Sequence, residues 1–366
     1  MKYWPIKYDK KFKSKAVRER TASNLLKLKK QIKSDLPGKD SDETLMLATW
    51  NIRELGNKKP KAKRLYENLF YMAEIISSFD IVAVQEVNDL DDLEELMRIL
   101  GDEWDFIATD VNDRSLGGNG ERMCFVYDTR KVKFKNIAGE IVLPANLLIS
   151  KTELKEDGKK IIAGKQFRRA PFLVSFQAGW FKFDLCTVHI YFGANSGKKL
   201  EERVEEIDGV ASYLGKIAKK EQKDKATILL GDFNIMNPEH KTMAALESNN
   251  FIVPKALQKK TNLKLDKYYD QIAFYGSDDL FRLGSKGQEK AGVFYIDKVL
   301  YTDWSVYEKE MRQNNEAKGK HDPWLRDEYF KKWKTFQMSD HHLMWAQLKI
   351  NDSNGYLEKI IGTKKT

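Results

Sequence analysis

Residues 226–236, ATILLGDFNIM, constrain the fold of this chain more than any other stretch. Residues 228–230 form an apolar run typical of a buried strand, and Gly231 permits a sharp change of backbone direction directly after it. Asp232 and Asn234 lie two residues apart, so on an extended chain they point the same way and place a carboxylate and an amide at one edge of a buried sheet. For an isolated GDFN sequence, a strand followed by an Asx-turn is the simpler alternative.

Other apolar runs of the chain also have a polar side chain at one end. In chain order, the polar residues are Asn51 after LMLATW, Glu86 after IVAVQ, His189 after FDLCTV, Asp232 and Asn234 after TILLG, and Asp340 and His341 before LMWAQL. Each of them alone is typical of a turn residue or a structural histidine. Because a buried sheet presents the ends of its strands at a common edge, five strand ends with polar residues of complementary type predict a site there.

The residue types at these strand ends match metal-assisted hydrolysis of a phosphoester. A hard cation such as Mg²⁺ prefers oxygen ligands, which Glu86, Asp340 and Asn51 can supply. Histidine acts as an acid or base near neutral pH, and the charge that develops on phosphoryl oxygens needs a cation and fixed donors. The sequence contains no HExxH, CxxC, Walker P-loop or GxSxG motif, so it does not indicate the zinc, nucleotide or serine-hydrolase sites that these motifs mark.

The formal net charge of +10 belongs to the N-terminal end of the chain. Residues 1–34 contain twelve Lys or Arg residues against Asp9 and Glu19, and the remainder has 52 basic and 52 acidic residues. A basic arm suits nucleic acid or another anionic surface, and it equally suits the solvated face of a helix. Apolar residues at helical spacing from Leu25 to Ile32 predict a helix within the arm.

The rest of the sequence predicts one α+β domain from about residue 44 to residue 350, because strand-like and helical runs are mixed and no interdomain linker separates them. Residues 1–43 form the basic, partly helical arm, and residues 351–366 form a peripheral tail. The strands expected late in the domain include residues 294–301. The first residues contain no apolar segment of a signal peptide, and no apolar run is long enough to span a membrane.

A helical insert is expected at about residues 303–337, where Trp304, Trp324 and Trp333 lie among dense charges. Amphipathic packing of one or two surface helices is the favoured interpretation of this segment, and stacking on nucleic-acid bases is the alternative. The two cysteines, Cys124 and Cys186, are expected to be buried free thiols in a reducing compartment, which predicts a cytoplasmic protein.

Eight motifs together resemble one known family. They are TWNIRELG (49–56), DIVAVQEV (80–87), ERMCFVYD (121–128), FRRAPFLVSF (167–176), TVHIY (187–191), ILLGDFN (228–234), YDQIAF (269–274) and SDHH (339–342). In these motifs and their order, the chain is similar to the endonuclease/exonuclease/phosphatase superfamily, and most closely to its deoxyribonuclease I-like branch. The resemblance covers about residues 44–350 and implies a four-layer α/β/β/α sandwich with the site at one edge of the two sheets.

The resemblance also implies metal- and phosphate-binding roles. Glu86 would be the principal carboxylate ligand of the metal, Asp340 would complete the metal side, and Asn51 would contact the metal shell or the phosphate. The implied cation is Mg²⁺, with Mn²⁺ or Ca²⁺ as alternatives. Arg53 and Arg169 would contact phosphate, to which the planar guanidinium group is suited.

Catalytic roles follow from the same resemblance. Asp232 would position or activate the attacking water, and Asn234 would donate to the phosphate. Glu121 would orient His189, and His341 would be a second catalytic histidine paired with an acid.

Two aspartates are candidates for the acid that pairs with His341. Asp270 in YDQI matches the nuclease pattern, and Asp297 in YIDKVL resembles the acid of related phosphatases and repair enzymes. We prefer Asp270, because the whole run KYYDQIAF has the form of the nuclease.

The predicted function is a metal-dependent endonuclease that hydrolyses DNA. Two departures from the nuclease pattern, Asn88 and Asn119, weaken the case for ordinary duplex DNA, and single-stranded DNA or RNA is a further possibility. The alternative is a phosphatase or phospholipase-like phosphodiesterase acting on a small or lipid phosphoester. An inactive binding scaffold is disfavoured, because every expected acid, amide and histidine has a candidate.

Overall fold

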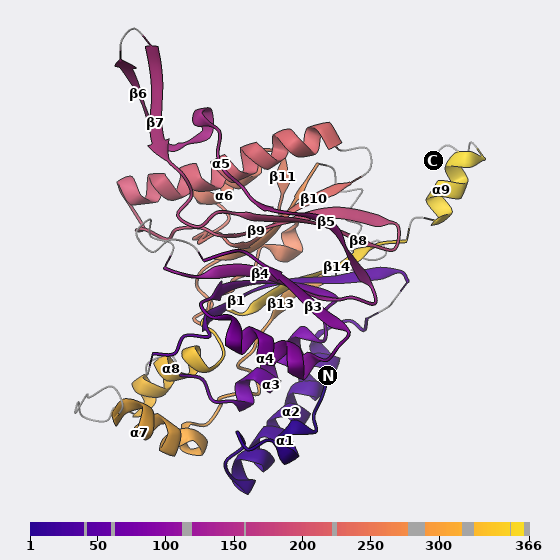
Figure 1. The fold of residues 1–366 in the computed structure, drawn as a ribbon, viewed down its shortest axis with the longest axis vertical. Coiled ribbons are helices and arrows are strands. Elements are labelled where there is room, and N and C mark those ends of the chain that lie inside the picture. The colour runs from indigo at the N-terminus through magenta and orange to yellow at the C-terminus, as the bar shows by residue number, and fades with distance from the viewer. Residues whose placement is uncertain are drawn as a thin grey trace.

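The strands of the chain form two stacked six-stranded sheets, seen in a computed structural model that describes residues 1–39, 42–59, 63–111, 119–156, 159–221, 225–276, 290–316, 326–351 and 353–361 (Figure 1). The first sheet contains, in order across it, β13 Ala291–Phe294, β14 Leu343–Lys349, β1 Thr44–Leu55, β2 Ile81–Val87, β4 Arg122–Asp128 and β3 Trp104–Ala108. The second contains β11 Phe251–Ile252, β12 Asp270–Tyr275, β10 Ala226–Asp232, β9 Phe181–His189, β8 Phe172–Ala178 and β5 Val132–Glu140. A separate hairpin is formed by β6 Ile149–Glu156 and β7 Lys159–Lys165.

Helices cover the outer face of each sheet (Figure 1). The first sheet is covered by α2 Lys15–Asp35, α3 Glu67–Ile76, α4 Leu90–Leu100, α7 Glu308–Glu316 and α8 Arg326–Gln337, and the second by α5 Lys198–Glu221 and α6 Lys241–Glu247. Short helices are α1 Pro5–Tyr8 and the 3₁₀ turns Ala145–Leu147, Lys255–Leu257 and Trp304–Tyr307, and α9 Ser353–Ile360 follows β14. The predicted four-layer α+β sandwich is therefore confirmed.

Strand β1 shows why the central strands have continuous apolar sequences. Leu45 and Leu47 pack into the core between the two sheets, whereas Met46, Ala48 and Trp50 pack into the core under the helices. Because successive side chains of a strand point to opposite faces, a strand that is covered on both sides needs apolar residues at every position.

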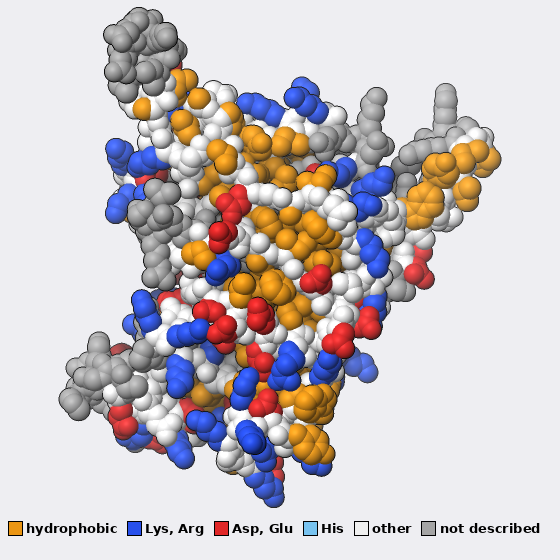
Figure 2. Space-filling model, in the orientation of Figure 1, with side chains coloured by type: hydrophobic (Ala, Val, Ile, Leu, Met, Phe, Trp, Pro, Cys, Tyr) orange, Lys and Arg blue, Asp and Glu red, His pale blue; other side chains and the backbone are white. Residues whose placement is uncertain are grey.

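The N-terminal arm packs on the body of the protein through α2. Leu25 and Leu28 are buried in the same core as α3, and the Asn24 amide donates to the hydroxyls of Tyr71 and Tyr307 at 3.1 Å each. The lysines at positions 27, 30 and 33 are exposed on the opposite side of the helix, and Figure 2 shows Lys and Arg side chains over the N-terminal helices. The arm thus combines a buried apolar side with a solvated basic side.

The segment 303–337 is helical where the structure describes it, and it packs by its amphipathic face. Tyr307, Met311 and Trp333 are buried, and Trp304 is partly buried against the same core. Trp324 lies outside the described residues. This burial supports the packing interpretation for Trp333.

One predicted strand is wrong in its position and its length, because β13 Ala291–Phe294 shares only Phe294 with the expected range. The strand expected at residues 294–301 ends at Phe294, because its partner β14 begins at Leu343, opposite Phe294. The backbone of residues 340 and 342, just before β14, is hydrogen-bonded to residues 263 and 261 instead. Cys124 and Cys186 are buried free thiols as predicted. None of the described helices is long and apolar enough to cross a membrane.

Candidate active site

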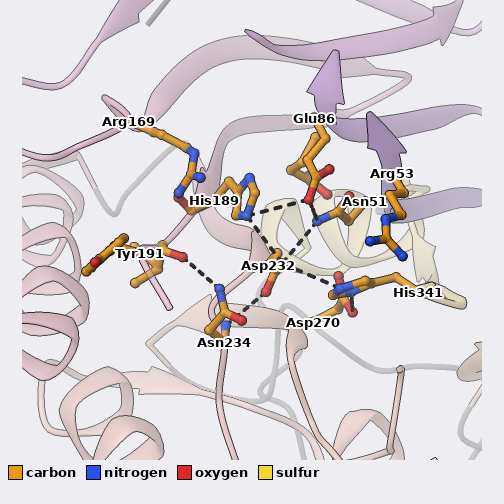
Figure 3. Close-up of polar contacts among 12 residues, drawn as sticks. Asn51, Arg53, Glu86, Arg169, His189, Tyr191, Asp232, Asn234, Asp270 and His341 are labelled. Atoms are coloured by element: carbon orange, nitrogen blue, oxygen red, sulfur yellow. Dashed lines mark hydrogen bonds and ion pairs between the residues drawn. The ribbon is translucent and has the colours of Figure 1, made fainter. Parts of the chain in front are cut away.

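The polar residues of the strand ends come together where the two sheets face each other. The parallel pairs β1–β2 and β9–β10 place Asn51 next to Gln85, and Asp232 next to His189. Asp270 begins β12 directly opposite Asp232. Figure 3 shows that His189 and His341 point toward Asp232 from two sides.

Asp232 is the centre of this arrangement and is almost fully buried. Its Oδ2 atom accepts from the Asn51 amide at 3.1 Å and lies 3.6 Å from His189 Nε2 and 3.8 Å from His341 Nε2. Its Oδ1 atom accepts from the backbone N–H of Asn234 at 2.9 Å, as in an Asx-turn. Both interpretations of the GDFN sequence therefore hold: Oδ1 of Asp232 makes the Asx-turn, and Oδ2 faces the site.

Gly231 makes the approach of β10 to β9 possible. Its φ is +133°, and a Cβ atom at this position would lie 2.2 Å from the carbonyl oxygen of Val188. Any other residue would clash with that backbone, so the glycine is required to bring Asp232 beside His189.

The first acid–histidine pair is Glu121–His189. His189 Nδ1 lies 3.2 Å from Glu121 Oε2, and Arg169 donates from Nε to Glu121 and from Nη1 to the His189 carbonyl at 3.3 Å. Burial and the Arg169 charge lower the pKa of His189, but Glu121 and Asp232 raise it, and the net pKa is above the ordinary value. Burial raises the pKa of Glu121, but His189 and Arg169 outweigh it and hold that pKa below the ordinary value.

The second pair is Asp270–His341. His341 Nδ1 lies 2.7 Å from Asp270 Oδ2, and the Asp270 backbone N–H donates to the Thr261 hydroxyl at 3.0 Å. Burial raises the pKa of Asp270, as does Asp232, and His341 offsets this only in part. Burial lowers the pKa of His341, but Asp270 and Asp232 outweigh it and hold that pKa well above the ordinary value.

Asp297, the other candidate acid, does not contact His341. It lies 3.9 Å from His342 Nε2 and 3.2 Å from Lys334 Nζ. The structure thus pairs His341 with Asp270, the aspartate that we preferred.

Glu86 and Asn51 form the part of the site that best fits a metal. The Asn51 amide donates to Glu86 Oε1 at 3.0 Å, and its buried Oδ1 has no hydrogen-bond partner among the described residues. Glu86 has a φ of +63°, and its side chain is 22% exposed. An unpartnered amide oxygen beside a partly exposed carboxylate is a donor set that suits a hard divalent cation.

Two groups of acids and histidine, one of which includes Glu86, are close enough to hold a cation. They are Glu86, Glu121 and His189, and Asp232, Asp270 and His341, with ligand atoms within 4.8 Å of one another. Each group contains a hydrogen-bonded acid–histidine pair, whose facing atoms are already engaged. The two acid–histidine pairs therefore fit proton transfer better than metal coordination.

Four residues with predicted roles make other contacts. Asp340, a predicted metal ligand, is 39% exposed and lies 3.0 Å from Arg53 Nη1. Arg169 is buried against Glu121, and Asn234 donates to the Ile190 carbonyl at 2.7 Å. A metal contact of Asp340 and phosphate contacts of Arg53, Arg169 and Asn234 stay predictions.

Residues that the sequence did not suggest support the site from behind. The Ser339 hydroxyl donates to the Asn51 carbonyl at 2.6 Å and accepts from the His341 backbone N–H at 3.0 Å. Thr261 supports Asp270, and the Tyr269 ring stacks on His341 with 5.6 Å between centroids. Ser339 and Tyr269 adjoin predicted site residues, but Thr261 follows no motif that could have revealed it.

Comparison with known proteins finds solved structures that are similar to this chain. A solved endonuclease/exonuclease/phosphatase family protein from Bacteroides thetaiotaomicron is similar over 84% of this chain and 98% of its own, with a TM-score of 0.50 and 19% identity. The human nocturnin catalytic domain has a TM-score of 0.48 and 13% identity over 84% of this chain and 95% of its own. A mannosyl-6-phosphatase from the same Bacteroides species has a TM-score of 0.46 and 20% identity over 64% and 86%.

The chain thus has the fold of the endonuclease/exonuclease/phosphatase superfamily, as its motifs predicted. No protein-family model matches the sequence, and no curated protein matches it either.

Proposed function

We propose that this protein is a metal-dependent phosphodiesterase, and specifically an endonuclease that hydrolyses DNA by attack of water on a phosphodiester. The observation that carries the proposal is the convergence of two histidines on one oxygen of Asp232. Each histidine is backed by a buried acid, and Asn51 and Glu86 lie beside the same oxygen. This arrangement supplies a carboxylate to orient a water and two imidazoles to move protons.

Asp232, His341 and His189 have different roles in the proposed hydrolysis. Asp232 accepts a hydrogen bond from the attacking water and orients it. The imidazolium of His341, which Asp270 favours, offsets charge on the phosphoryl oxygens or donates a proton to the leaving oxygen. His189, whose pKa is raised less strongly, accepts the proton that the attacking water releases.

A divalent cation fits the Glu86 end of the site. Glu86 and Asn51 would hold it, with Asp340 as a third oxygen ligand, and Mg²⁺ is the preferred ion over Mn²⁺ or Ca²⁺. When bound, it would offset the charge of the phosphoryl oxygens.

Cleavage assays test the reaction directly. Supercoiled plasmid, single-stranded DNA, RNA and a panel of phosphomonoesters are incubated with Mg²⁺ or Mn²⁺, beside a His189→Ala, Asp232→Ala double variant. Metal-dependent nicking that the double variant lacks is expected. Turnover of a small phosphoester without cleavage of nucleic acid would instead support the phosphatase or phospholipase-like alternative.

Contact of DNA with the basic arm forms a second part of the proposal. Lys27, Lys30 and Lys33 project from the exposed side of α2, and no ion pair is recorded for them in the described part of the chain. Reversing all three charges to Glu is expected to weaken DNA binding and to reduce its salt slope by up to about three, because each phosphate contact contributes about 0.9. Deleting the arm is a poorer test, since Leu25 and Leu28 belong to the core.

A matched control is available on α5, in the opposite helical layer. Lys216, Lys219 and Lys220 are also exposed on a helix, and their reversal makes the same change in net charge. DNA affinity that falls equally in both triple variants would reflect net charge alone, and unchanged affinity in the α2 variant would remove the arm from the proposal.

A further inference from the structure

A row of aromatic rings leads from the surface of the protein to His341. Phe192, three residues after His189, is 38% exposed. Its ring meets the Tyr269 ring edge to face with 6.3 Å between centroids, and the Tyr269 ring in turn stacks on His341 at 5.6 Å. An exposed aromatic side chain therefore lies one ring away from a proposed catalytic histidine.

Arg203 holds Phe192 in place. Its guanidinium carbon lies 4.5 Å from the centre of the Phe192 ring, and the arginine itself is fully buried. It donates to the Asn234 carbonyl at 2.8 Å and to the Ala194 carbonyl, which lie on the loops after β10 and β9. One face of the ring is therefore fixed on the protein, so a ligand that stacks on its exposed part meets an ordered surface.

Tyr269 also lies within the electrostatic surroundings of the site. Burial raises the pKa of its hydroxyl, and the carboxylates of Asp232 and Asp266 raise it further. The phenol is thus neutral at physiological pH, and its ring offers an uncharged surface beside His341. An apolar, flat group bound to the reacting phosphate has a place to stack here.

We propose that Phe192 and Tyr269 form a stacking subsite for the nucleobase next to the scissile phosphate. The inference rests on the proposed function and specifies its substrate as nucleic acid in which that base is unpaired. A base inside a duplex already stacks on two neighbours, whereas an unpaired base can be turned onto protein aromatic rings. A cationic lipid headgroup could also meet an aromatic ring, but the Arg203 charge behind Phe192 repels it.

The test compares two single-stranded oligonucleotides that differ only in the bases flanking one phosphate, which are present in one and absent in the other. Phe192→Leu keeps an apolar side chain but removes the ring. It is expected to lower kcat/KM for the base-containing strand by roughly 5- to 100-fold and to leave the abasic strand nearly unchanged. Phe192→Trp is expected to keep the preference for the base.

Trp180→Leu is the matched control, because Trp180 is a 59% exposed aromatic in the turn between β8 and β9. It is expected to leave kcat/KM unchanged for both strands. Equal losses on both strands in Phe192→Leu would mean that the residue only positions the loop, and unchanged rates on both would mean that no base stacks there. Either result overturns the subsite while leaving the proposed hydrolysis intact.

A binding measurement tests the stacking subsite independently of whether the protein cleaves nucleic acid. Asp232→Ala protein is titrated with a strand that contains 2-aminopurine, whose fluorescence is quenched when it stacks. Quenching that is lost in the Phe192→Leu, Asp232→Ala variant supports the subsite even if no strand is cleaved. Equal quenching in both proteins, or none in either, overturns it.

Discussion

Glu121–His189 and Asp270–His341 are both buried acid–histidine pairs that face the same carboxylate, but the first contains an arginine and the second does not. Arg169 donates to Glu121, so this acid keeps a cationic partner whether or not His189 is protonated. For Asp270, the recorded ion-pair partner within the described part of the chain is His341 itself. The same kind of acid–histidine pair is thus placed in two different electrostatic settings.

The difference suggests a division of labour. In the arginine-free pair, protonation of His341 offsets the charge of Asp270, so the two groups favour the imidazolium. In the other pair, Arg169 opposes protonation of His189 while Glu121 favours it. Two histidines with different proton affinities can act as donor and acceptor at one pH.

Removal of each histidine should have the largest effect. His189→Ala and His341→Ala are each expected to lower kcat by about 10²- to 10⁴-fold, because each loses an acid–base group. Stability should separate them: His341→Ala leaves Asp270 buried without its cation and is expected to cost about 3 kcal/mol, whereas Glu121 retains Arg169 in His189→Ala.

Urea unfolding at pH 7 measures this difference in stability, and His341→Ala with Asp270→Asn is the control. The double variant should recover part of the lost stability, since no acid is left unpaired. Equal unfolding free energies for the two single histidine variants would contradict the proposed contrast between the pairs.

Exchange of the acid behind His341 should have the next largest effect. Asp270→Asn is expected to lower kcat on the order of 10²-fold, because an amide can neither favour the imidazolium nor reliably fix the tautomer. Asp297→Asn is its matched control. It is expected to change kcat less than about threefold, because Asp297 does not contact His341. Activity measured on folded protein decides between them, and loss only in Asp297→Asn would make our assignment wrong.

The sequence predicted the strand ends well because their signal is local. A strand buried on both faces must be apolar throughout, so the polar residue after it stands out, as Asn51 does after β1. Which side chains then meet depends on sheet order. Asp270 lies opposite Asp232 because β12 lies beside β10, and it reaches His341, which precedes β14, because the two sheets face each other. No spacing in the sequence contains these neighbour relations.

The contacts of Arg169 and Thr261 could not be predicted for a related reason. Arg169 is 48 residues from Glu121, and either phosphate or a buried acid suits a guanidinium group. Thr261 is nine residues from Asp270, in a loop without periodicity. The strand expected at 294–301 was wrong because its end is set by a partner strand and not by its own apolar residues.

The proton affinity of His189 tests the role of the arginine without any metal. In metal-free protein, Arg169→Gln removes a positive charge that opposes the imidazolium, so the pKa of His189 should rise. Glu121→Gln removes the negative charge that favours the imidazolium, so the same pKa should fall. NMR titration of the imidazole resonances measures both shifts, and His240, which is distant in sequence from both substitutions, serves as an internal reference. Shifts of the same sign would contradict the opposing roles of the two residues.

The smallest expected effect concerns Thr261, which supports the pair that has no arginine. Its hydroxyl accepts the backbone N–H of Asp270 at 3.0 Å, and its side chain is fully buried. Thr261→Val leaves that N–H without its acceptor and should cost about 1–3 kcal/mol in unfolding free energy, whereas Thr261→Ser keeps the hydroxyl and should cost less. If Asp270 depends on this contact for its position, kcat should fall a few-fold in the valine variant and recover in the serine variant. Equal kcat and stability in both variants would show that the Asp270 carboxylate is held in place by the sheet alone.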